Sequence, residues 1–461
     1  MSIIKTYQDL LQIPDNEKQR ADFVNDVITA HKCSDIYKEA VIAEQYLKHK
    51  NVTITNYQKF LYTVTGGQIP DIWSANFKMG CRHFYRFITQ ENQFLLGNGV
   101  TWNNPDTAEK LGTETKPFDN QLQKAGKMAL WGGVAFGFFN LDHVDVFAVT
   151  EYAPLYDEED GAMKAGVRFW QVATDKPLRA ILYELDGYTE YMFIKSSKIT
   201  PSEDWEKLTD SIYYKKKRSY REISEGTEID GSQIYDGENY PTFPIIPLWG
   251  NPEHQSELIG LREQIDAYDL IKSQFADNES EASYILYTLG NASGMDDIDL
   301  AQFVEKLRTL HAATVPDEVD VQSHSLSVPH ESREALLDRI DKDLYRDAMA
   351  LDTSNIAGGA VTATEIEAAY DPLNSKCDEY EYCVLDFIQG ILAVAGIQDS
   401  ARFTRSMIVN TSEMITNIVQ ASGSLPEDYV VEKLMTVLGD ADKVNEVIEQ
   451  IHADLLPTIE E

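Results

Sequence analysis

The stretch PTFPIIPLW, residues 241–249, divides this chain of 461 residues into two parts of different character. Each of its three prolines lacks a backbone N–H donor and pushes the residue before it toward an extended conformation, so a regular helix cannot pass through the stretch. Short apolar runs separated by turn residues come before it, and long segments with helical periodicity come after it. We therefore expect a structural boundary at this stretch.

The part before the boundary is typical of helices followed by an antiparallel sheet. Capping residues and apolar periodicity predict helices from about Asp15 to Lys50 and from about Ala75 to Phe94. From about Val134 to Tyr240, runs rich in Val, Phe, Tyr and Ile alternate with Asp-Gly turn signals, which predicts an antiparallel meander with one solvated face. The aromatic stripe expected on one buried face of this sheet consists of Tyr183, Tyr188, Tyr191 and Phe193.

The part after the boundary predicts a pair of amphipathic helices, from about Gln255 to Phe275 and from about Ser332 to Leu351. Apolar residues recur there at steps of three and four, which places them on one face of each helix. The residues expected to pack in this pair are Leu258, Leu261, Ile265, Tyr268, Leu336, Ile340 and Leu344. Between the helices, a strand-like run at 284–287, a helical segment around 299–310 and an extended piece at 315–328 predict a small α/β insertion.

A loop and a long helix follow this pair. Two adjacent glycines, Gly358 and Gly359, break the helical pattern within residues 352–362. A helix is then expected from Ala363 to about Ala395, with a kink at Pro372, because a proline cannot donate the backbone bond to the preceding turn. From about residue 410, short helices punctuated by glycine and proline complete the chain.

The composition excludes some classes of protein. With 40 basic and 76 acidic side chains, the formal net charge is −36, which does not suit a protein that holds nucleic acid by neutralising phosphates. The sequence has no signal-peptide pattern and no run of about 18 apolar residues, so a soluble protein made in the cytosol is expected. The cysteines lack metal-binding or redox spacing and are expected to be reduced and mostly packed: Cys33, Cys81, Cys377 and Cys383.

The sequence predicts no catalytic residues, no cofactor and no metal site, since it lacks the GxxxxGK[ST], GxSxG and HExxH motifs. The glycines within residues 132–137 favour close packing or a turn over a phosphate loop. The acidic run at 157–160 favours a solvated turn over a calcium site or a carboxylate pair. The basic run Lys215–Arg218 favours an exposed hairpin, with a contact to DNA or to an acidic neighbour as the alternative. His311 and His324 are expected to be surface histidines.

The order of these parts resembles the siphophage-type portal family, the head-to-tail connector proteins of tailed bacteriophages. In the second half the resemblance rests on PIIPLWGN at 244–251, LREQIDAYD at 261–269 followed by Ser273, and IAGGAVTATE at 356–365. Looser matches in the first half are YLKHK at 46–50, NFK at 76–78 and FLLGNGV at 94–100. Each motif is short, and their order along most of the chain carries the resemblance.

The resemblance implies an α+β fold in a closed ring, dodecameric in the virion, at the portal vertex of the capsid. Double-stranded phage DNA would pass through it without sequence specificity during packaging, would be retained, and would be ejected. The implied partners are the terminase motor, the major capsid and scaffolding proteins and the head-completion adaptor, with no membrane. The implied parts are a wing (1–250 and 363–410), stem helices (251–277 and 331–351), a clip (278–330), a tunnel loop (352–362) and a short helical crown (411–461).

By the same resemblance, the tunnel loop reaches into the channel and touches the passing DNA. The residues assigned to this contact are Thr353, Ser354, Asn355, Ile356, Ala357, Gly358, Gly359, Ala360 and Val361. They carry no formal charge, so the loop can touch phosphates without holding them. Between Pro252 and Glu281, eight acidic side chains oppose two basic ones, and this net charge of −6 would repel phosphate from a ring of such helices.

Two other classes of protein stay open. An acidic virion hydrolase that uses two carboxylates would be a monomer or a small oligomer with an apolar pocket. Another ring-forming component of the head-tail connector, such as a head-completion adaptor, is the second alternative, although adaptors are usually much shorter than this chain.

Overall fold

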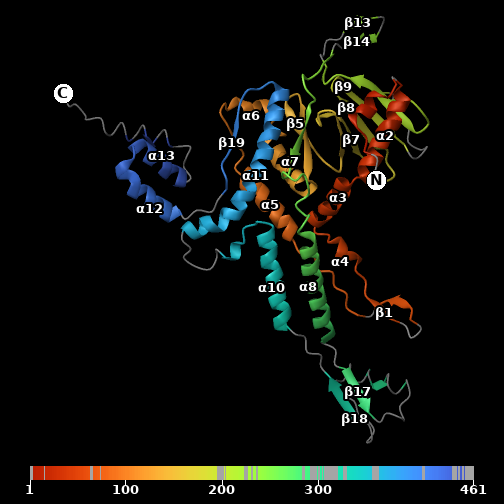
Figure 1. The fold of residues 1–461 in the computed structure, drawn as a ribbon, viewed down its shortest axis with the longest axis vertical. Coiled ribbons are helices and arrows are strands. Elements are labelled where there is room, and N and C mark those ends of the chain that lie inside the picture. Colours follow the sequence, from red (N-terminus) through yellow and green to blue (C-terminus); the bar gives the residue numbers. More distant parts are fainter. Residues whose placement is uncertain are drawn as a thin grey trace, which may run out of the picture. The chain divides into compact units, whose positions relative to one another are not determined.

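The computed structural model of the chain describes residues 4–14, 16–62, 66–72, 74–194, 202, 204–222, 227–229, 232–234, 237–282, 286–290, 298, 302–303, 305, 320–324, 330–355, 363–406, 411–438, 444, 447–448 and 451. The chain forms two compact units, of which the first comprises residues 1–44, 86–259 and 348–461 and the second residues 45–85 and 260–347 (Figure 1). No described helix is long and apolar enough to cross a membrane.

The first unit contains two main antiparallel sheets and a set of described helices. The described helices are α1 (Tyr7–Leu11), α2 (Glu17–Cys33), α6 (Asp106–Leu111), α7 (Phe118–Gly132), α11 (Ala363–Ala395), α12 (Thr411–Ala421) and α13 (Glu427–Leu438). Two further helices, α3 (Asp35–Leu47) and α5 (His83–Leu96), have residues in both units. Short 3-10 helices are η1 (Thr353–Asn355) and η2 (Ser422–Ser424).

The main strands of this unit are β4 (Val134–Asn140), β5 (His143–Ala148), β6 (Tyr152–Tyr156), β7 (Met163–Trp170), β8 (Leu178–Glu184), β9 (Gly187–Phe193), β10 (Glu206–Lys207), β11 (Ile212–Arg218) and β16 (Ile245–Trp249). Shorter strands form three separate pairs: β3 (Val100–Trp102) with β19 (Ala401–Phe403), β12 (Arg221–Glu222) with β15 (Gly237–Glu238), and β13 (Thr227–Ile229) with β14 (Ser232–Ile234).

A six-stranded sheet in the order β10-β11-β9-β8-β7-β6 confirms the predicted meander for β6 to β9, whereas β4 and β5, which were expected in the same meander, belong to a separate sheet with β16. One face of the six-stranded sheet packs against α2 in a core that contains Phe23, Val24 and Leu182. The prediction of a solvated second face is wrong. Tyr183, which follows Leu182 and therefore points to the opposite face, is only 4% exposed and stacks on Tyr220.

The predicted aromatic stripe is divided between the two faces of this sheet. Tyr183 and Tyr188 are direct cross-strand partners and share one face. Tyr191 is paired with Ala180 and packs in the core against α2, on the other face. The prediction of a single face is therefore wrong, because side chains alternate along a strand and Tyr191 lies three positions after Tyr188.

The stretch that breaks the chain into two parts supplies an edge strand. Residues 245–249 form β16, which pairs antiparallel with β4, and β5 completes this three-stranded sheet. Helices α7 and α11 pack on it. A Cβ atom at Gly137 would lie 2.4 Å from the ring of Phe387, and one at Gly390 would lie 2.6 Å from Ile246, so glycines let α11 approach the sheet closely.

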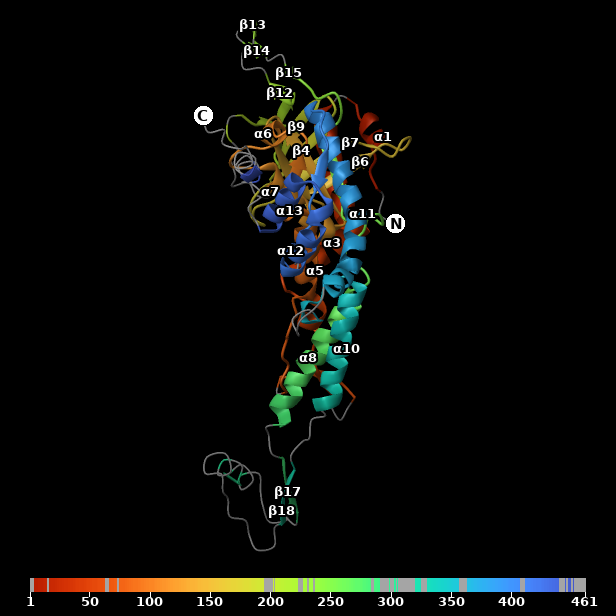
Figure 2. The same ribbon diagram turned by 90° about the vertical axis from the view of Figure 1, so that its left-hand side faces the viewer.

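The second unit contains a helix pair, α8 (Arg262–Ala282) and α10 (His330–Asp347), which run side by side in Figures 1 and 2. It also contains α4 (Val52–Asn56), the hairpin of β1 (Phe60–Tyr62) and β2 (Gln68–Pro70), and the hairpin of β17 (Leu286–Gly290) and β18 (Asp320–His324). The β17–β18 pair confirms the strands of the predicted insertion. The helix expected around residues 299–310 and His311 lie largely outside the described residues.

Several predicted helix bounds were wrong. The first helix is broken at Ser34, which is extended and caps α3 by accepting from the backbone N–H of Tyr37. The second begins at His83, since residues 76–82 are not helical. The first helix of the pair begins at Arg262, because the Asn251 side chain holds residue 255 in a turn. Helix α11 has the predicted bounds and contains Pro372, and the bend there stays a prediction.

Candidate functional site

Leu351, the residue before the expected tunnel loop, is hydrogen-bonded to helix α5. The Gln90 side chain makes two hydrogen bonds with the backbone of Leu351: Nε2 donates to the carbonyl oxygen and Oε1 accepts from the N–H, each at 3.1 Å. The Leu351 side chain is buried in a small core with Phe94 and Tyr370. The residue before the loop is therefore fixed to the first unit.

Three residues assigned to the loop are described. Thr353, Ser354 and Asn355 form η1, and the Asp352 carboxylate accepts from Ser354 N–H at 2.9 Å and from its hydroxyl at 2.7 Å. Thr353 and Ser354 are exposed. Residues 356–361, with both glycines, lie outside the described residues, so their place in a channel stays a prediction.

A buried ammonium holds the helix that follows the loop. Lys376 Nζ on α11 lies 2.8 Å from a carboxylate oxygen of Glu91 on α5 and 2.6 Å from one of Glu257 in the segment after β16. Glu91 is 2% exposed. Burial raises the pKa of the Glu91 carboxyl, and the opposing effect of Lys376 is offset in part by the Glu257 carboxylate. Sequence reasoning missed this triad, since its members are far apart in the chain and belong to no motif.

Arg405 fixes α11 at a second point, shortly after Pro372. Its Nη1 donates to the backbone carbonyl and to the side-chain oxygen of Asn374, each at 3.1 Å. Its Nη2 lies 2.5 Å from Asp378 and 2.8 Å from Glu381. Because Arg405 follows β19, the return strand and the helix are bound together in the turn that comes after the proline.

In the second unit, polar side chains of α8 bind an extended segment of backbone. The three bonds, called here the side-chain ladder, run from Phe77 N to Asp277 Oδ1 at 2.7 Å, from Met79 N to Ser273 Oγ at 3.0 Å and from Cys81 N to Asp269 Oδ1 at 2.8 Å. Residues four apart lie on one face of a helix, and residues two apart point the same way in an extended chain. In the sequence, the ladder is indicated by Asp269, Ser273 and Asp277, which recur every four residues and follow Ile265 on the same helix face.

Other contacts engage the same acidic side chains. Asp269 accepts from Asn51 Nδ2 at 2.8 Å, and Asp266 accepts from the Tyr46 hydroxyl at 2.5 Å. Lys59 Nζ lies 3.0 Å from Asp277. Several of the eight acidic residues between 252 and 281 are therefore bonded within the chain, and the repulsion of phosphate by a ring of such helices stays a prediction.

The residues expected to pack in the helix pair differ in burial. Leu258, Leu261, Ile265 and Leu344 are buried, Tyr268 and Ile340 are half-buried, and Leu336 is 47% exposed. Their packing between neighbouring copies stays a prediction.

The basic run at 215–218 ends strand β11, which pairs antiparallel with β10 and β9, and the prediction of an exposed hairpin is confirmed for residues 216–218, while Lys215 is half-buried. The lysines of this run lie beside carboxylates of the same chain: Lys215 is 3.2 Å from Glu190, Lys216 is 3.3 Å from Glu206 and Lys217 is 3.1 Å from Glu184. The acidic neighbour considered for this run is thus intramolecular.

The acidic run at 157–160 forms the predicted turn, with Gly161 at φ 69°, but its first residue is not solvated. Asp157 is 7% exposed, accepts from Gln8 Nε2 of α1 at 2.6 Å and is bonded to Lys164. The hydrogen bond from Lys164, together with those from the Glu159 N–H and Gln8, lowers the pKa of Asp157 to about 2.

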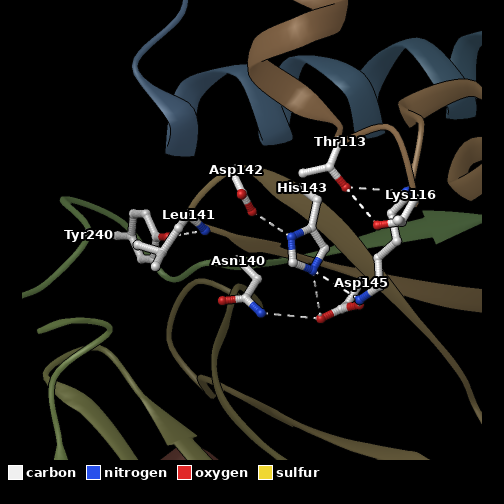
Figure 3. A network of polar contacts seen from close by, with 9 residues as sticks. Thr113, Lys116, Asn140, Leu141, Asp142, His143, Asp145 and Tyr240 are labelled. Atoms are coloured by element: carbon white, nitrogen blue, oxygen red, sulfur yellow. Dashed lines mark hydrogen bonds and ion pairs between the residues drawn. The ribbon is translucent and has the colours of Figure 1, made fainter.

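A polar network closes the turn between β4 and β5. Figure 3 shows the ring of His143 between Asp142, whose oxygen lies 2.6 Å from Nδ1, and Lys116, whose Nζ lies 3.0 Å from Nε2. Lys116 Nζ is also 2.5 Å from Asp145. Burial alone would raise the pKa of Asp145, but the Lys116 ammonium and the Asn140 amide lower it below its usual value. The network fastens the loop before α7 to this turn.

The arrangement closest to a nucleophilic centre is Cys81, His83 and Asp341. Cys81 Sγ lies 2.9 Å from His83 Nδ1, and His83 Nε2 lies 2.7 Å from Asp341 Oδ1. Burial and the Asp269 carboxylate raise the pKa of the Cys81 thiol to about 12, so it stays protonated and unreactive at neutral pH. Of the four cysteines, which were expected to be mostly packed, Cys377 is buried, Cys81 and Cys383 are half-buried, and Cys33 is exposed. In the described part of the chain, no group of His, Cys, Asp and Glu is placed to hold a metal ion.

Comparisons with known proteins cover most of the chain. Residues 44–455 match the family model described as phage portal protein, SPP1 Gp6-like. The chain is 25% identical over 429 residues to the portal protein of Bacillus phage SPP1, covering 85% of this chain and 79% of that protein. It is 24% identical over 221 residues to the portal protein of Clostridium phage phiCD119, covering 45% of this chain and 49% of that protein. A solved structure of the neck of an empty gene transfer agent particle contains a similar chain, with 10% identity, a TM-score of 0.44 and coverage of 78% of this chain and 90% of that one.

Proposed function

This chain belongs to the phage portal protein family of the SPP1 Gp6-like type, and we propose that twelve copies of it close into the ring through which double-stranded DNA passes at one vertex of a phage capsid. The family match over residues 44–455 is the observation that carries this proposal. The ring serves DNA packaging, retention and ejection as a conduit within the virion, and its work is mechanical rather than enzymatic.

The parts of the chain take the following roles in this proposal. The helix pair α8 and α10 belongs to the stem, and residues 278–330, from the last residues of α8 to the first residue of α10, form the clip that docks the terminase motor and later the head-completion adaptor. The first unit supplies the wing, which meets the capsid and scaffolding proteins, and α12 and α13 belong to the crown.

Residues 353–361 form the loop that touches DNA. Two features support this role. Leu351, which precedes the loop, is bonded to Gln90, and α11, which follows the loop, is bonded to Glu91 through Lys376, so the segments on both sides of the loop are held on α5. Its residues are neutral, and neutral groups can exchange hydrogen bonds with successive phosphates without the salt-dependent affinity that a cation adds.

The substitution Asn355→Lys tests the loop. It places one cation per subunit in the channel, so we expect rings to assemble normally but to package DNA more slowly, with the largest defect at low salt. Val172→Lys is the matched control, because it adds the same charge at a site that is 85% exposed in a turn of the first unit. The measurements are negative-stain imaging of rings and the packaging rate across salt concentrations. Equal packaging rates for both variants at every salt concentration would show that the loop does not lie in the channel.

A further inference from the structure

The large apolar side chains that the chain leaves exposed are concentrated in one segment of the second unit. Of the 22 that are exposed in the described part of the chain, eight lie within residues 57–79. They are Tyr57, Phe60, Leu61, Tyr62, Ile69, Ile72, Phe77 and Met79. Tyr62 and Ile72 are the most exposed of the eight, at 75% and 76%. Such a concentration on a folded protein marks a surface that another molecule covers.

This segment, residues 57–82 and called here the arm, has a defined path. Its distal part is the β1–β2 hairpin, which Figure 1 shows standing away from α8, and every described residue of both strands is exposed. Its proximal part is held on α8 by the side-chain ladder and by the Lys59–Asp277 ion pair. A two-stranded hairpin is at best marginally stable in water, so the distal part needs a partner surface.

The charge of the arm identifies the kind of partner. In a chain of net charge −36, the arm carries one acidic side chain, Asp71, and three basic ones, of which Lys59 is paired with Asp277 of its own α8, leaving Lys78 and Arg82 as the charges that bear on a partner. The helix pair has the opposite balance, since α8 and α10 together contain twelve acidic and six basic side chains. It also exposes an apolar side chain of its own, Leu336. An arm that is apolar and basic is complementary to a helix surface that is acidic and partly apolar.

We propose that the arm of one copy of this chain packs on the α8–α10 helix pair of the next copy. The two complementary surfaces are different parts of the same chain, so the contact is head-to-tail, and head-to-tail contacts generate closed rings when the rotation between copies closes. The inference rests on the proposed function, because it assumes that the chain forms a ring, and it adds the element that joins one subunit to the next.

The double variant Tyr62→Ser, Ile72→Ser tests the arm. Both side chains are about three-quarters exposed in the chain, so we expect the subunit to fold without them. The control is Val172→Ser, Tyr382→Ser, which removes two side chains that are 85% and 72% exposed in the first unit. Mass photometry across a dilution series gives the subunit concentration at half-assembly. We expect the arm variant to raise it by about a hundredfold and the control to leave it unchanged.

Charge reversal tests the partner surface. Arg82→Glu is expected to weaken assembly, and adding Glu334→Lys and Asp338→Lys, two exposed positions on α10, is expected to restore it in part. No recovery in the combined variant would overturn the assignment of the helix pair as the partner.

The outcomes separate this inference from the proposed function. If the wild-type chain and the arm variant form rings at the same concentration, the arm does not join subunits and the inference is wrong, while the ring stands. If the arm variant forms normal rings that fail to enter capsids, a capsid or scaffolding protein covers the arm, which also overturns the inference. If the wild-type chain forms no ring at any concentration, the proposed function itself is lost.

Discussion

At Lys376, one ammonium faces the carboxyl groups of Glu91 and Glu257. Lys376→Met would leave both carboxylates without a partner. We expect this change to lower the free energy of unfolding by about 3–5 kcal/mol, the usual cost of leaving a buried charge unpaired. Chemical denaturation of the variant measures it, and a loss below about 1 kcal/mol would show that the three side chains do not form this triad.

Glu91→Gln at the same site is expected to have an effect that depends on pH. The pKa of Glu91 is raised in the folded chain, so the stabilisation linked to its proton is complete at low pH and is lost as the pH rises through the folded pKa. Glutamine does not ionise. The variant should therefore gain stability relative to the wild type as the pH rises from about 5 to about 8, and a difference that is independent of pH would contradict this.

Asp157 gives the opposite dependence. Its pKa is lowered to about 2 by Lys164, the Glu159 N–H and Gln8, so the stabilisation is complete above the ordinary aspartate pKa and is lost as the pH falls toward 2. Because Gln8 belongs to α1, this helix should become sensitive to proteases in that range, and Asp157→Asn should make it so at neutral pH. Asp160→Asn is the control, since Asp160 does not contact α1, and equal protease sensitivity of the two variants at neutral pH would refute the role of Asp157.

For single residues, the sequence could predict features formed by neighbouring residues but not contacts between residues that are far apart in the chain. The neutral loop at 353–361 and the turn at Asp160-Gly161 are local patterns and were visible in the sequence. The partners of Lys376 and of Lys215 come from distant segments, and nothing in one sequence indicates which carboxylate meets which ammonium.

At the scale of elements, the side-chain ladder sets where a helix ends and an extended segment begins. Ser273→Ala would remove the acceptor of the Met79 N–H without adding side-chain volume at this buried position. We expect a loss of about 1–3 kcal/mol for the unsatisfied donor. Faster amide exchange at residues 77–81 should accompany it. Glu263→Gln, at an exposed position of α8, is the control, and unchanged exchange in the Ser273 variant would exclude the ladder.

Elements with strong periodicity were predicted well. The long helix α11 has the predicted bounds, and the meander of β6 to β9 and the two helices of the pair are present. The errors concerned the ends of helices and the burial of the sheet faces. Residues 75–82 contain residues compatible with a helix, yet their backbone N–H groups bind α8 instead of the preceding turn. The second face of the meander was expected to be solvated because the sequence does not show that Tyr220 returns to cover it.

At the scale of the whole molecule, the net charge of −36 and the pairing of the 215–217 lysines with carboxylates predict that the assembled ring does not bind duplex DNA. We expect no shift of linear DNA in a gel at physiological salt. Rings of Asn355→Lys should bind weakly, with an affinity that falls steeply with salt. Salt-dependent binding of duplex DNA by the wild-type ring would contradict the proposal that the channel lets DNA pass without holding it.

The side-chain ladder also joins two repeats of slightly different length. Four residues of an α-helix advance about 6 Å and two residues of extended chain about 6.6 Å, so the two scales drift apart by roughly 0.6 Å at each rung. The two repeats therefore stay in register for only a few bonds. The residue four positions before Asp269 is the apolar Ile265, which cannot accept a hydrogen bond. The residue four positions after Asp277 is Glu281, whose carboxylate lies 3.9 Å from Lys59 Nζ. An insertion of one residue within 77–81 would turn the alternate N–H groups away from α8, so the tolerance for length changes in this segment is close to zero.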